Sequence, residues 1–429
     1  MKSSFPQLEK INGQDIAWYC LRAVEAYQAQ VRFSAAISGL VTSKLNGPLS
    51  PKPPPPSPTS LLPLLAMRRS TRKALRHVLL FLLTISLVIY LTSPTTPRST
   101  KTFPWAKVQY ITTSTSLPPA RGKCPHLTSM SKPALVVASV EADDKDWLTP
   151  LSKKYHTCIY TADGPLNPKS GFLQIPKNKG NEAMAYLTFI IDNYSSIPRA
   201  GVVFIHGSRF AWHNDHARYD NLALLRDLNL ERAVGEGSGY HNLRCDWSLS
   251  TCPTDVKAQG SLENKVQAVL VPYDNRAVSD SLLPKALGRI FGNGVVKMAS
   301  SDVLKSQCCA QFVVSRESIL QHEKEEYVAL RQWLLDEGSG AAPANNKYAG
   351  RILSYVWHIL FLSREKVGVP GEGLSLESLN REACPSAEEC YCRIYGRCGL
   401  EGCKKGSCRG QYSLPKNLKV PENQRETGS

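Results

Sequence analysis

Apolar residues in the second half of the chain recur with the spacing of buried strands and helices. Residues 134–140 form a continuous apolar run of strand length, which predicts a strand buried on both faces. Residues 155–161 and 201–205 predict two more strands; a short helix that ends near Lys154 and a strongly apolar helix over residues 183–194 lie between them. This alternation predicts an α/β fold, an open and mostly parallel sheet with helices on both faces and right-handed crossovers.

The same kind of pattern continues toward the C-terminus. Residues 308–314 predict another strand, and residues 316–337 and 348–362 predict two long helices. We therefore assign residues 133–365 to one α/β domain. Residues 366–429 are assigned to a Cys-rich C-terminal extension.

The first 132 residues have a different character. Residues 1–66 combine an amphipathic helical pattern over residues 16–37 with eight prolines within residues 48–63, which indicate an extended linker. A chain that started at Met67 would be a complete, short-tailed anchored protein, so residues 1–66 are expected to be a cytoplasmic tail that the mature product can lack. Residues 94–132 are rich in Thr, Ser and Pro and are expected to form a stalk.

An apolar stretch with a basic border lies between the tail and the stalk. It runs from Val78 to Leu91, and residues 67–93 are assigned as a basic flank and a single transmembrane helix in a lipid bilayer. A helix of about 16 residues reaches roughly 24 Å, which suits the thinner bilayers of early secretory compartments. A buried core helix and a cleaved signal peptide are the alternatives. A flank of five basic residues with no acidic one disfavours the first, and the prolines after the stretch disfavour the second.

The distribution of charge agrees with an anchor and disfavours a nucleic-acid partner. The formal net charge is +16, but residues 67–132 hold eleven basic residues and no acidic one, whereas residues 133–429 have a balance of only +2. A basic groove for a phosphate backbone is therefore not expected on the folded domain. More basic residues precede the apolar stretch than follow it, which predicts a type II membrane protein with a signal-anchor and a lumenal C-terminal domain in the Golgi or another secretory compartment.

The cysteines are distributed as this orientation requires. Cys20 precedes the apolar stretch, and the other twelve follow it. Six of them fall within 25 residues: Cys384, Cys390, Cys392, Cys398, Cys403 and Cys408. Their spacing lacks the C-x-x-C pair of common zinc sites, so in an oxidising lumen it predicts disulfides. A local disulfide is expected between Cys245 and Cys252, whereas the adjacent Cys308 and Cys309 are expected not to bond to each other.

Several sequence segments relate the chain to other proteins. VVASVEADDKDWL, GYHNLRCDW, CCAQFVVSRESIL, YVWHILF and CPSAEECYCRIYGRC belong to a set that extends over most of residues 133–400. On these segments the chain resembles a fungal family of uncharacterised, singly anchored membrane proteins with a domain of unknown function, a resemblance that brings no established reaction. The helix start Gly180-Asn181-Glu182, followed by an apolar strand, also resembles bacterial proteins of surface-polysaccharide loci, some of them glycosyltransferase-like. The second resemblance implies a nucleotide-sugar transferase domain. The D-x-D expected after the third strand is absent, however, and His213-Asn214-Asp215-His216 stands in its place.

A first polar cluster follows the first predicted strand. Ligands of open α/β sheets bind at the carboxyl ends of the strands, so Asp143, Asp144 and Asp146 are candidates for binding a cofactor or nucleotide. The alternative is that these aspartates form a solvated loop or cap the next helix.

A second polar cluster follows the third predicted strand. His213, Asp215 and His216 are candidate ligands for Mg²⁺ or Mn²⁺, either of which would neutralise the diphosphate of a nucleotide sugar. Asp215 and His213, together with Glu182, are the candidate catalytic residues. The alternatives are a hydrogen-bonded loop without metal for the two histidines and a helix cap for Glu182.

These observations lead to one function and two alternatives. We expect a metal-assisted glycosyltransferase of the secretory pathway that acts on a glycan or cell-wall acceptor. A non-catalytic lumenal module that binds glycan or protein is the first alternative, and a metal-dependent hydrolase built on His213, Asp215 and His216 is the second. His206 and His358 are expected to be structural histidines with satisfied hydrogen bonds.

Overall fold

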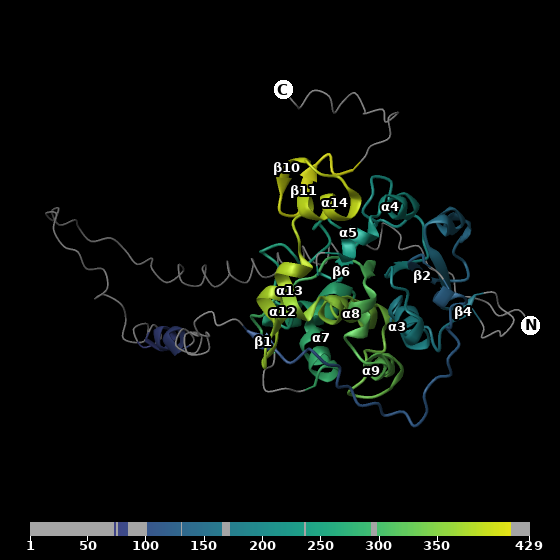
Figure 1. Ribbon diagram of the computed structural model, residues 1–429. Helices are drawn as coiled ribbons and strands as arrows, with labels where there is room; N and C mark the ends of the chain where they lie inside the picture. The colour runs from purple at the N-terminus through teal and green to yellow at the C-terminus, as the bar shows by residue number, and fades with distance from the viewer. Residues whose placement is uncertain are drawn as a thin grey trace, which may run out of the picture. The chain divides into compact units, whose positions relative to one another are not determined.

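The chain consists of two compact units, Met1–Thr95 and Thr96–Ser429. The computed structural model describes residue 73 and residues 76–84, 101–129, 131–164, 172–235, 237–292 and 298–412 (Figure 1). The amphipathic pattern and the proline-rich linker predicted before residue 67 lie outside the described residues.

In the first unit, residues 76–84 are helical and exposed. The Thr84 hydroxyl donates a hydrogen bond to the Phe81 carbonyl oxygen at 2.8 Å. Within the described residues, no helix is both long and apolar enough to cross a bilayer. The remainder of the predicted span, residues 85–91, lies outside them.

A six-stranded sheet forms the centre of the second unit, with the strand order β4-β3-β2-β5-β7-β6. Its strands are β2 (Ala134–Ser139), β3 (His156–Thr161), β4 (Leu173–Gln174), β5 (Val202–His206), β6 (Tyr240–Asn242) and β7 (Phe312–Val314). The pairs β2–β3, β2–β5 and β3–β4 are parallel, whereas β7 is antiparallel to both of its neighbours. The predicted mostly parallel sheet is therefore confirmed.

The order of the strands reverses in the middle of this sheet. The chain passes from β2 to β3 and β4 on one side, and then crosses to β5 on the other side of β2. The carboxyl ends of β2 and β5 consequently lie next to each other at the point of reversal. Open α/β sheets bind their ligands at such points.

Helices cover both faces of the sheet, as the α/β pattern predicts (Figure 1). The α-helices of this unit's described residues are α3 (Ala183–Asp192), α4 (Asn221–Asp227), α5 (Leu230–Val234), α6 (Leu262–Leu270), α7 (Asn275–Ile290), α8 (Arg316–Leu320), α9 (Lys324–Leu335), α10 (Asn346–Ser354), α11 (Trp357–Phe361), α12 (Arg364–Val367), α13 (Leu376–Ala383) and α14 (Ala387–Tyr395). The 3₁₀ helices are η2 (Leu127–Ser129), η3 (Asp146–Lys153) and η4 (Tyr194–Ser196). A small sheet of β1 (Thr102–Phe103), β8 (Gly368–Val369) and β9 (Gly373–Ser375) and a hairpin of β10 (Glu401–Lys404) and β11 (Ser407–Arg409) complete the fold.

The apolar run of β2 is explained by two cores, one on each face of the sheet. Ala134 and Val136 point into the larger core, which also contains side chains of α3, α7, α9, α10 and α11. Leu135 and Val137 point into the second core, with side chains of η3, α4, α5 and α14. Because both faces of β2 are covered, its sequence is apolar throughout and does not alternate.

Two of the predicted helices are each broken into two. The helix predicted over residues 316–337 is α8 and α9, because a capping box starts α9 at Glu323, whose backbone N–H donates to Glu326 Oε1 at 3.1 Å. The helix predicted over residues 348–362 is α10 and α11. The prediction of two long helices was wrong, since apolar periodicity continues across both breaks.

All twelve cysteines among the described residues are in disulfides, which confirms the prediction of a disulfide-rich chain. The pairs are Cys124–Cys158, Cys245–Cys390, Cys252–Cys384, Cys308–Cys309, Cys392–Cys398 and Cys403–Cys408. The predicted pair of Cys245 with Cys252 was wrong, because each of them binds a cysteine of the C-terminal segment instead. The expectation for Cys308 and Cys309 was also wrong. Cys309 has a φ of 90°, and this turn, which an extended strand would not contain, lets the two adjacent side chains meet.

Residues 101–129 pack against the α/β domain. Phe103, Trp105 and Val108 are buried in the larger core. Cys124 is bonded to Cys158 of β3. The region expected to form a stalk therefore includes a segment that packs on the α/β domain, through a few large apolar side chains among many Thr, Ser and Pro residues.

Candidate functional site

The ends of β2 and β5 are in close contact where the sheet reverses. A Cβ atom added at Gly207 would lie 2.6 Å from Asp143 Oδ2 and 2.9 Å from Ser139 Cβ, so only glycine fits there. Asp143 accepts hydrogen bonds from the Val140 N–H at 2.9 Å and from the Ser208 hydroxyl at 3.3 Å. Asp143 therefore joins the loop after β2 to the loop after β5.

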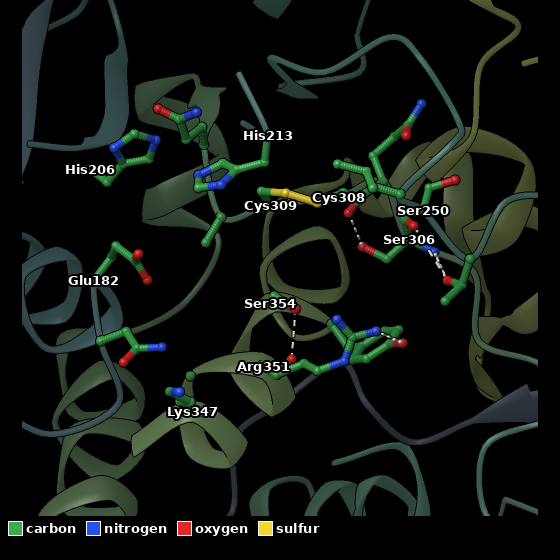
Figure 2. Close-up of a pocket in the computed structure, with 18 residues that line it drawn as sticks. Glu182, His206, His213, Ser250, Ser306, Cys308, Cys309, Lys347, Arg351 and Ser354 are labelled. Carbon is green, nitrogen blue, oxygen red and sulfur yellow. Dashed lines mark hydrogen bonds between the residues drawn. A yellow bond between two sulfur atoms is a disulfide. The ribbon is translucent and has the colours of Figure 1, made fainter. Parts of the chain in front are cut away.

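A polar cavity of about 190 Å³ contains the end of β5 in its wall (Figure 2). Its other walls come from the start of α3, the segment before β7, the loop after β6, and α10. Figure 2 shows Glu182 and His206 on one side and Ser250 and Ser306 on the other. The cavity thus combines one carboxyl group and imidazoles with several hydroxyl and amide groups, a lining suited to a polar ligand.

The backbone before α3 places Glu182 in this cavity. Gly180 and Asn181 both have positive φ, 72° and 53°. A Cβ atom at Gly180 would lie 2.8 Å from Leu334 Cδ2, and one at Gly350 would lie 2.7 Å from Asn181 Nδ2, so the turn packs tightly on α9 and α10. The Glu182 side chain makes no capping hydrogen bond to α3, which leaves its carboxyl group to the cavity. Burial raises the pKa of Glu182 above its ordinary value.

Asn214 fixes the protonation of the His206 ring. The Asn214 side-chain nitrogen donates to the carbonyl oxygens of Arg209 and Tyr219, at 3.0 and 2.9 Å, so the orientation of the amide is set. Its oxygen lies 3.0 Å from His206 Nε2 and 3.0 Å from Gln311 Nε2, and accepts from both. In a neutral imidazole only one nitrogen carries a proton, so Nδ1 of His206 is left as an acceptor.

His213 forms an imidazole pair with His206, and both rings are neutral at pH 7. Their centroids are 4.8 Å apart. Burial, together with the nearby His213, lowers the pKa of His206 to about 4. Burial and the charge of Arg244 lower the pKa of His213, whose carbonyl oxygen accepts a hydrogen bond from Arg244 Nη1 at 2.8 Å. Neutral rings can accept a proton or a hydrogen bond from a ligand hydroxyl.

The remaining wall of the cavity contains a disulfide and the guanidinium group of Arg351. The Cys308–Cys309 disulfide lines the cavity and supplies part of its apolar surface. Arg351 donates to the Tyr355 hydroxyl at 3.3 Å, and that hydroxyl donates to Asp280 Oδ1 at 2.9 Å. The guanidinium group is therefore held in place at the cavity by Tyr355, the C-cap of α10, and through it by Asp280 of α7.

Asp215 is not part of the cavity lining. It is 1% exposed, and its carboxylate accepts hydrogen bonds from the Tyr412 hydroxyl at 2.8 Å, the Tyr391 hydroxyl at 3.0 Å and the Cys245 N–H at 2.7 Å. These contacts bind it to the C-terminal segment and to the loop after β6. The structure thus brings two of the predicted catalytic residues, His213 and Glu182, into one cavity and puts Asp215 elsewhere.

The predicted metal ligands after β5 do not converge on one point. His216 is buried, and its Nδ1 accepts a hydrogen bond from the Arg218 N–H at 3.3 Å. Within the described residues, the one group of three His, Cys, Asp or Glu whose ligand atoms lie within 4.8 Å of one another is Cys124, His156 and Cys158. Its two sulfur atoms are bonded to each other.

The predicted cofactor-binding aspartates lie at the carboxyl end of β2, outside the cavity lining. Asp143 is partly buried, whereas Asp144 and Asp146 are exposed. The Asp146 N–H donates to Asp144 Oδ1 at 2.9 Å, a local hydrogen bond within the loop that leads into η3.

Several residues of the cavity were missed by sequence reasoning. Gln311 and the Cys308–Cys309 disulfide belong to a segment predicted as strand, and nothing local indicates that they turn toward Glu182. Arg351 did give a signal, since a lone arginine stands inside an apolar helical pattern.

The fold and the site define a class: an α/β domain with a polar, carboxyl- and histidine-lined cavity beside the reversal point of its sheet. The chain belongs to the family described as protein of unknown function (DUF3431), whose match covers residues 135–393. No curated protein and no solved structure matches the chain.

Proposed function

We propose that this chain transfers a sugar from an activated donor to a hydroxyl group of a glycan or cell-wall acceptor. One observation carries the proposal. Glu182, with its raised pKa, and the neutral His206 and His213 line a single polar cavity at the carboxyl end of β5. Groups tuned in this way are suited to general base catalysis near neutral pH. The amides and hydroxyls of the cavity are suited to the hydroxyls of a sugar.

Glu182 is the residue to which we assign the base. The acceptor oxygen attacks the anomeric carbon of the donor, its O–H bond breaks, and the proton passes to the Glu182 carboxylate. The bond from the anomeric carbon to the leaving diphosphate breaks, and the diphosphate takes the electron pair. His206, through its unprotonated Nδ1, accepts a hydrogen bond from a sugar hydroxyl and orients it.

The strand order supports a nucleoside diphosphate sugar as the donor. Numbered by their appearance in the chain, the six strands have the order 3-2-1-4-6-5, whose first four positions match the 3-2-1-4 of dinucleotide-binding sheets. Those sheets bind the nucleotide at the point of reversal. We therefore propose that the donor lies along the loop of Asp143 and Asp144 and that its sugar reaches the cavity.

A divalent cation fits the donor side of this arrangement better than the loop after β5. The Asp215 side chain is 1% exposed and its carboxylate is engaged by buried hydroxyl and N–H donors, whereas Asp144 is exposed to solvent. Asp143 and Asp144 follow the carboxyl end of β2, and Mg²⁺ accepts one or two carboxylates completed by substrate phosphates. A Mg²⁺ or Mn²⁺ held there would offset the charge of the diphosphate.

We also propose a secretory location for the reaction. Six disulfides are typical of an oxidising compartment such as the lumen of the Golgi. The apolar stretch from Val78 to Leu91 is the proposed anchor, and the lipid bilayer is its partner. A folded domain with almost no net charge is consistent with a glycan acceptor and with no nucleic-acid partner.

The test uses the full chain in detergent with a panel of UDP- and GDP-sugars. Release of free nucleoside diphosphate is measured with and without a mixture of glycan acceptors, in Mn²⁺, in Mg²⁺ and with a chelator. A transferase releases diphosphate in proportion to the acceptor. A hydrolase would contain bound zinc and show no nucleotide preference, and a non-catalytic module would bind glycan without turnover. Absence of donor turnover in every arm would overturn the proposal.

A further inference from the structure

The loop between β5 and α4 exposes three aromatic side chains. Phe210 is 61%, Trp212 67% and Tyr219 51% exposed. Large aromatic rings are normally buried, because each of them removes much apolar surface from water on burial. Three exposed rings in one short loop are therefore an unusual feature of this surface. We refer to this segment, residues 207–220 with its three exposed rings, as the aromatic loop.

Exposure of these rings does not result from a loosely held loop. The Asn214 amide ties together the backbone at Arg209 and Tyr219 through two hydrogen bonds. Arg209 makes two hydrogen bonds to the Asp220 carboxylate, at 2.9 and 3.0 Å. The Asn221 N–H donates to the Arg209 carbonyl oxygen at 2.9 Å. The loop is thus closed on itself and fixed, which presents the rings in a defined arrangement.

The aromatic loop is continuous with the polar cavity. The ring centroids of Trp212 and His213 are 5.4 Å apart, and His213 and His206 both line the cavity. Asn214 links the two features directly, since its amide nitrogen closes the loop and its oxygen accepts from His206. A ligand that fills the cavity can therefore extend over the aromatic loop.

The chemistry of the loop separates it from a second exposed apolar surface. On α6 the exposed apolar residues are Leu262, Val266, Val269 and Leu270, an aliphatic stripe on one helix face. Such a stripe is typical of contact with protein or lipid. The rings of the aromatic loop instead stand next in sequence to Arg209, His213 and Arg218, which are exposed or partly exposed. Flat rings beside hydrogen-bonding groups match a sugar, which has an apolar C–H face and a polar edge of hydroxyls.

We propose that the aromatic loop is a binding subsite for a carbohydrate chain whose terminal sugar occupies the cavity. This inference rests on the proposed function and names the acceptor as an oligosaccharide of several residues. The sugars next to the terminal one pack their C–H faces on Trp212, Phe210 and Tyr219. The hydroxyl edges meet Arg209 and the polar groups of the loop.

The test measures binding of linear hexasaccharides of mannose, of glucose and of N-acetylglucosamine to the full chain in detergent micelles. Titration calorimetry gives the affinity. The part of the tryptophan fluorescence change that is lost in Trp212→Ala reports on the loop, since Trp212 is exposed, Trp247 is partly buried and Trp105, Trp147, Trp333 and Trp357 are buried. We expect the Phe210→Ala, Trp212→Ala double variant to bind its hexasaccharide at least about 10-fold more weakly.

Three comparisons make the result specific. Leu270→Ala, which removes an equally exposed side chain from α6, should leave the affinity unchanged. The matching monosaccharide should bind the wild type and the double variant equally, because it reaches the cavity alone. Glu182→Gln should keep hexasaccharide binding, so turnover can fail while the subsite stands. The proposal is overturned if none of the hexasaccharides binds, or if the double variant binds them as tightly as the wild type does.

Discussion

The buried carboxylate of Asp215 stabilises the attachment of the C-terminal segment. It accepts hydrogen bonds from the Tyr391 and Tyr412 hydroxyls and from the Cys245 N–H. Burial and the Asp215 charge raise the pKa of both tyrosines, which therefore remain donors throughout the physiological range.

We expect Asp215→Ala to lower the free energy of unfolding by about 3 kcal/mol. The substitution leaves several buried donors without an acceptor, and each lost hydrogen bond to a charged group costs about 1.5–3 kcal/mol, partly offset by relaxation. Denaturant unfolding followed by circular dichroism measures the change. Asp255→Ala, at an exposed position, is the matched control and should be near neutral. An unchanged unfolding free energy for Asp215→Ala would contradict the structural role.

Three buried histidines make the stability of the chain depend on pH. Burial lowers the pKa of His206 to about 4, of His241 to about 4 and of His358 to about 3. An unfolded histidine takes up a proton below about pH 6.5. Between that pH and the folded pKa, the unfolded chain binds more protons than the folded chain. The contribution of these neutral histidines to the free energy of unfolding is therefore present above pH 6.5 and is lost as the pH falls toward their folded pKa.

His358 isolates this effect. Both of its ring nitrogens are buried and have no hydrogen-bond partner among the described residues, so the expectation of a satisfied histidine was wrong. At pH 5 the buried, neutral His358 lowers the free energy of unfolding by on the order of 2 kcal/mol relative to a residue that does not titrate. We expect His358→Leu to flatten the fall in unfolding free energy between pH 7 and pH 5. Equal slopes for the variant and the wild type would contradict the account.

At the scale of elements, two disulfides that involve α14 close loops of very different length. Cys245–Cys390 spans 145 residues, whereas Cys392–Cys398 spans only 6. The entropy of the unfolded chain falls more when a longer loop is closed. The two bonds therefore differ in their contribution to stability although both involve α14.

We expect removal of Cys245–Cys390 by Ala substitution to lower stability by about 5 kcal/mol, and removal of Cys392–Cys398 by about 2 kcal/mol. Paired alanine substitutions avoid free thiols that could exchange. Thermal unfolding of both variants under oxidising conditions measures the order. If removal of the Cys392–Cys398 disulfide lowered the stability more than removal of Cys245–Cys390, the pairing or the role of α14 in the second core would be contradicted.

The elements differ in how far the sequence predicts them. The strands β2 and β5 were predictable, because strands covered on both faces are largely apolar and bounded by polar loops. The strand β3 is instead rich in β-branched and aromatic residues, which favour a strand. The breaks between α8 and α9 and between α10 and α11 were not predictable, since they depend on local hydrogen bonds within an unbroken apolar pattern.

The candidate site was predicted in part for the same reason. Glu182 and His213 could be found because each lies beside a predicted strand or helix end. The role of Asp215 could not, since it depends on Tyr391 and Tyr412, which are 176 and 197 residues away in the sequence. Disulfide partners such as Cys245 and Cys390 are likewise set by the tertiary fold.

For the whole molecule, the proposed anchor and the disulfides imply the same compartment. We expect the chain to resist alkaline extraction from membranes, and the domain to be protected from protease in intact vesicles. Arginine at both Leu80 and Leu83 should release the chain, because each charge in the centre of a span costs about 2.5–3.5 kcal/mol. Val266→Arg on the exposed face of α6 is the control. A protease-accessible domain with free thiols would contradict the lumenal assignment.

The most direct test of the proposed reaction is the rate of sugar transfer by Glu182→Gln under saturating donor and acceptor. Glutamine keeps the size and polarity of the side chain but cannot take the acceptor proton. The account predicts a fall in kcat of about 10²–10⁴-fold with unchanged donor affinity and melting temperature. Glu377→Gln, on the exposed first turn of α13, should retain the wild-type rate. A Glu182→Gln protein that transfers sugar at the wild-type rate would contradict the central claim.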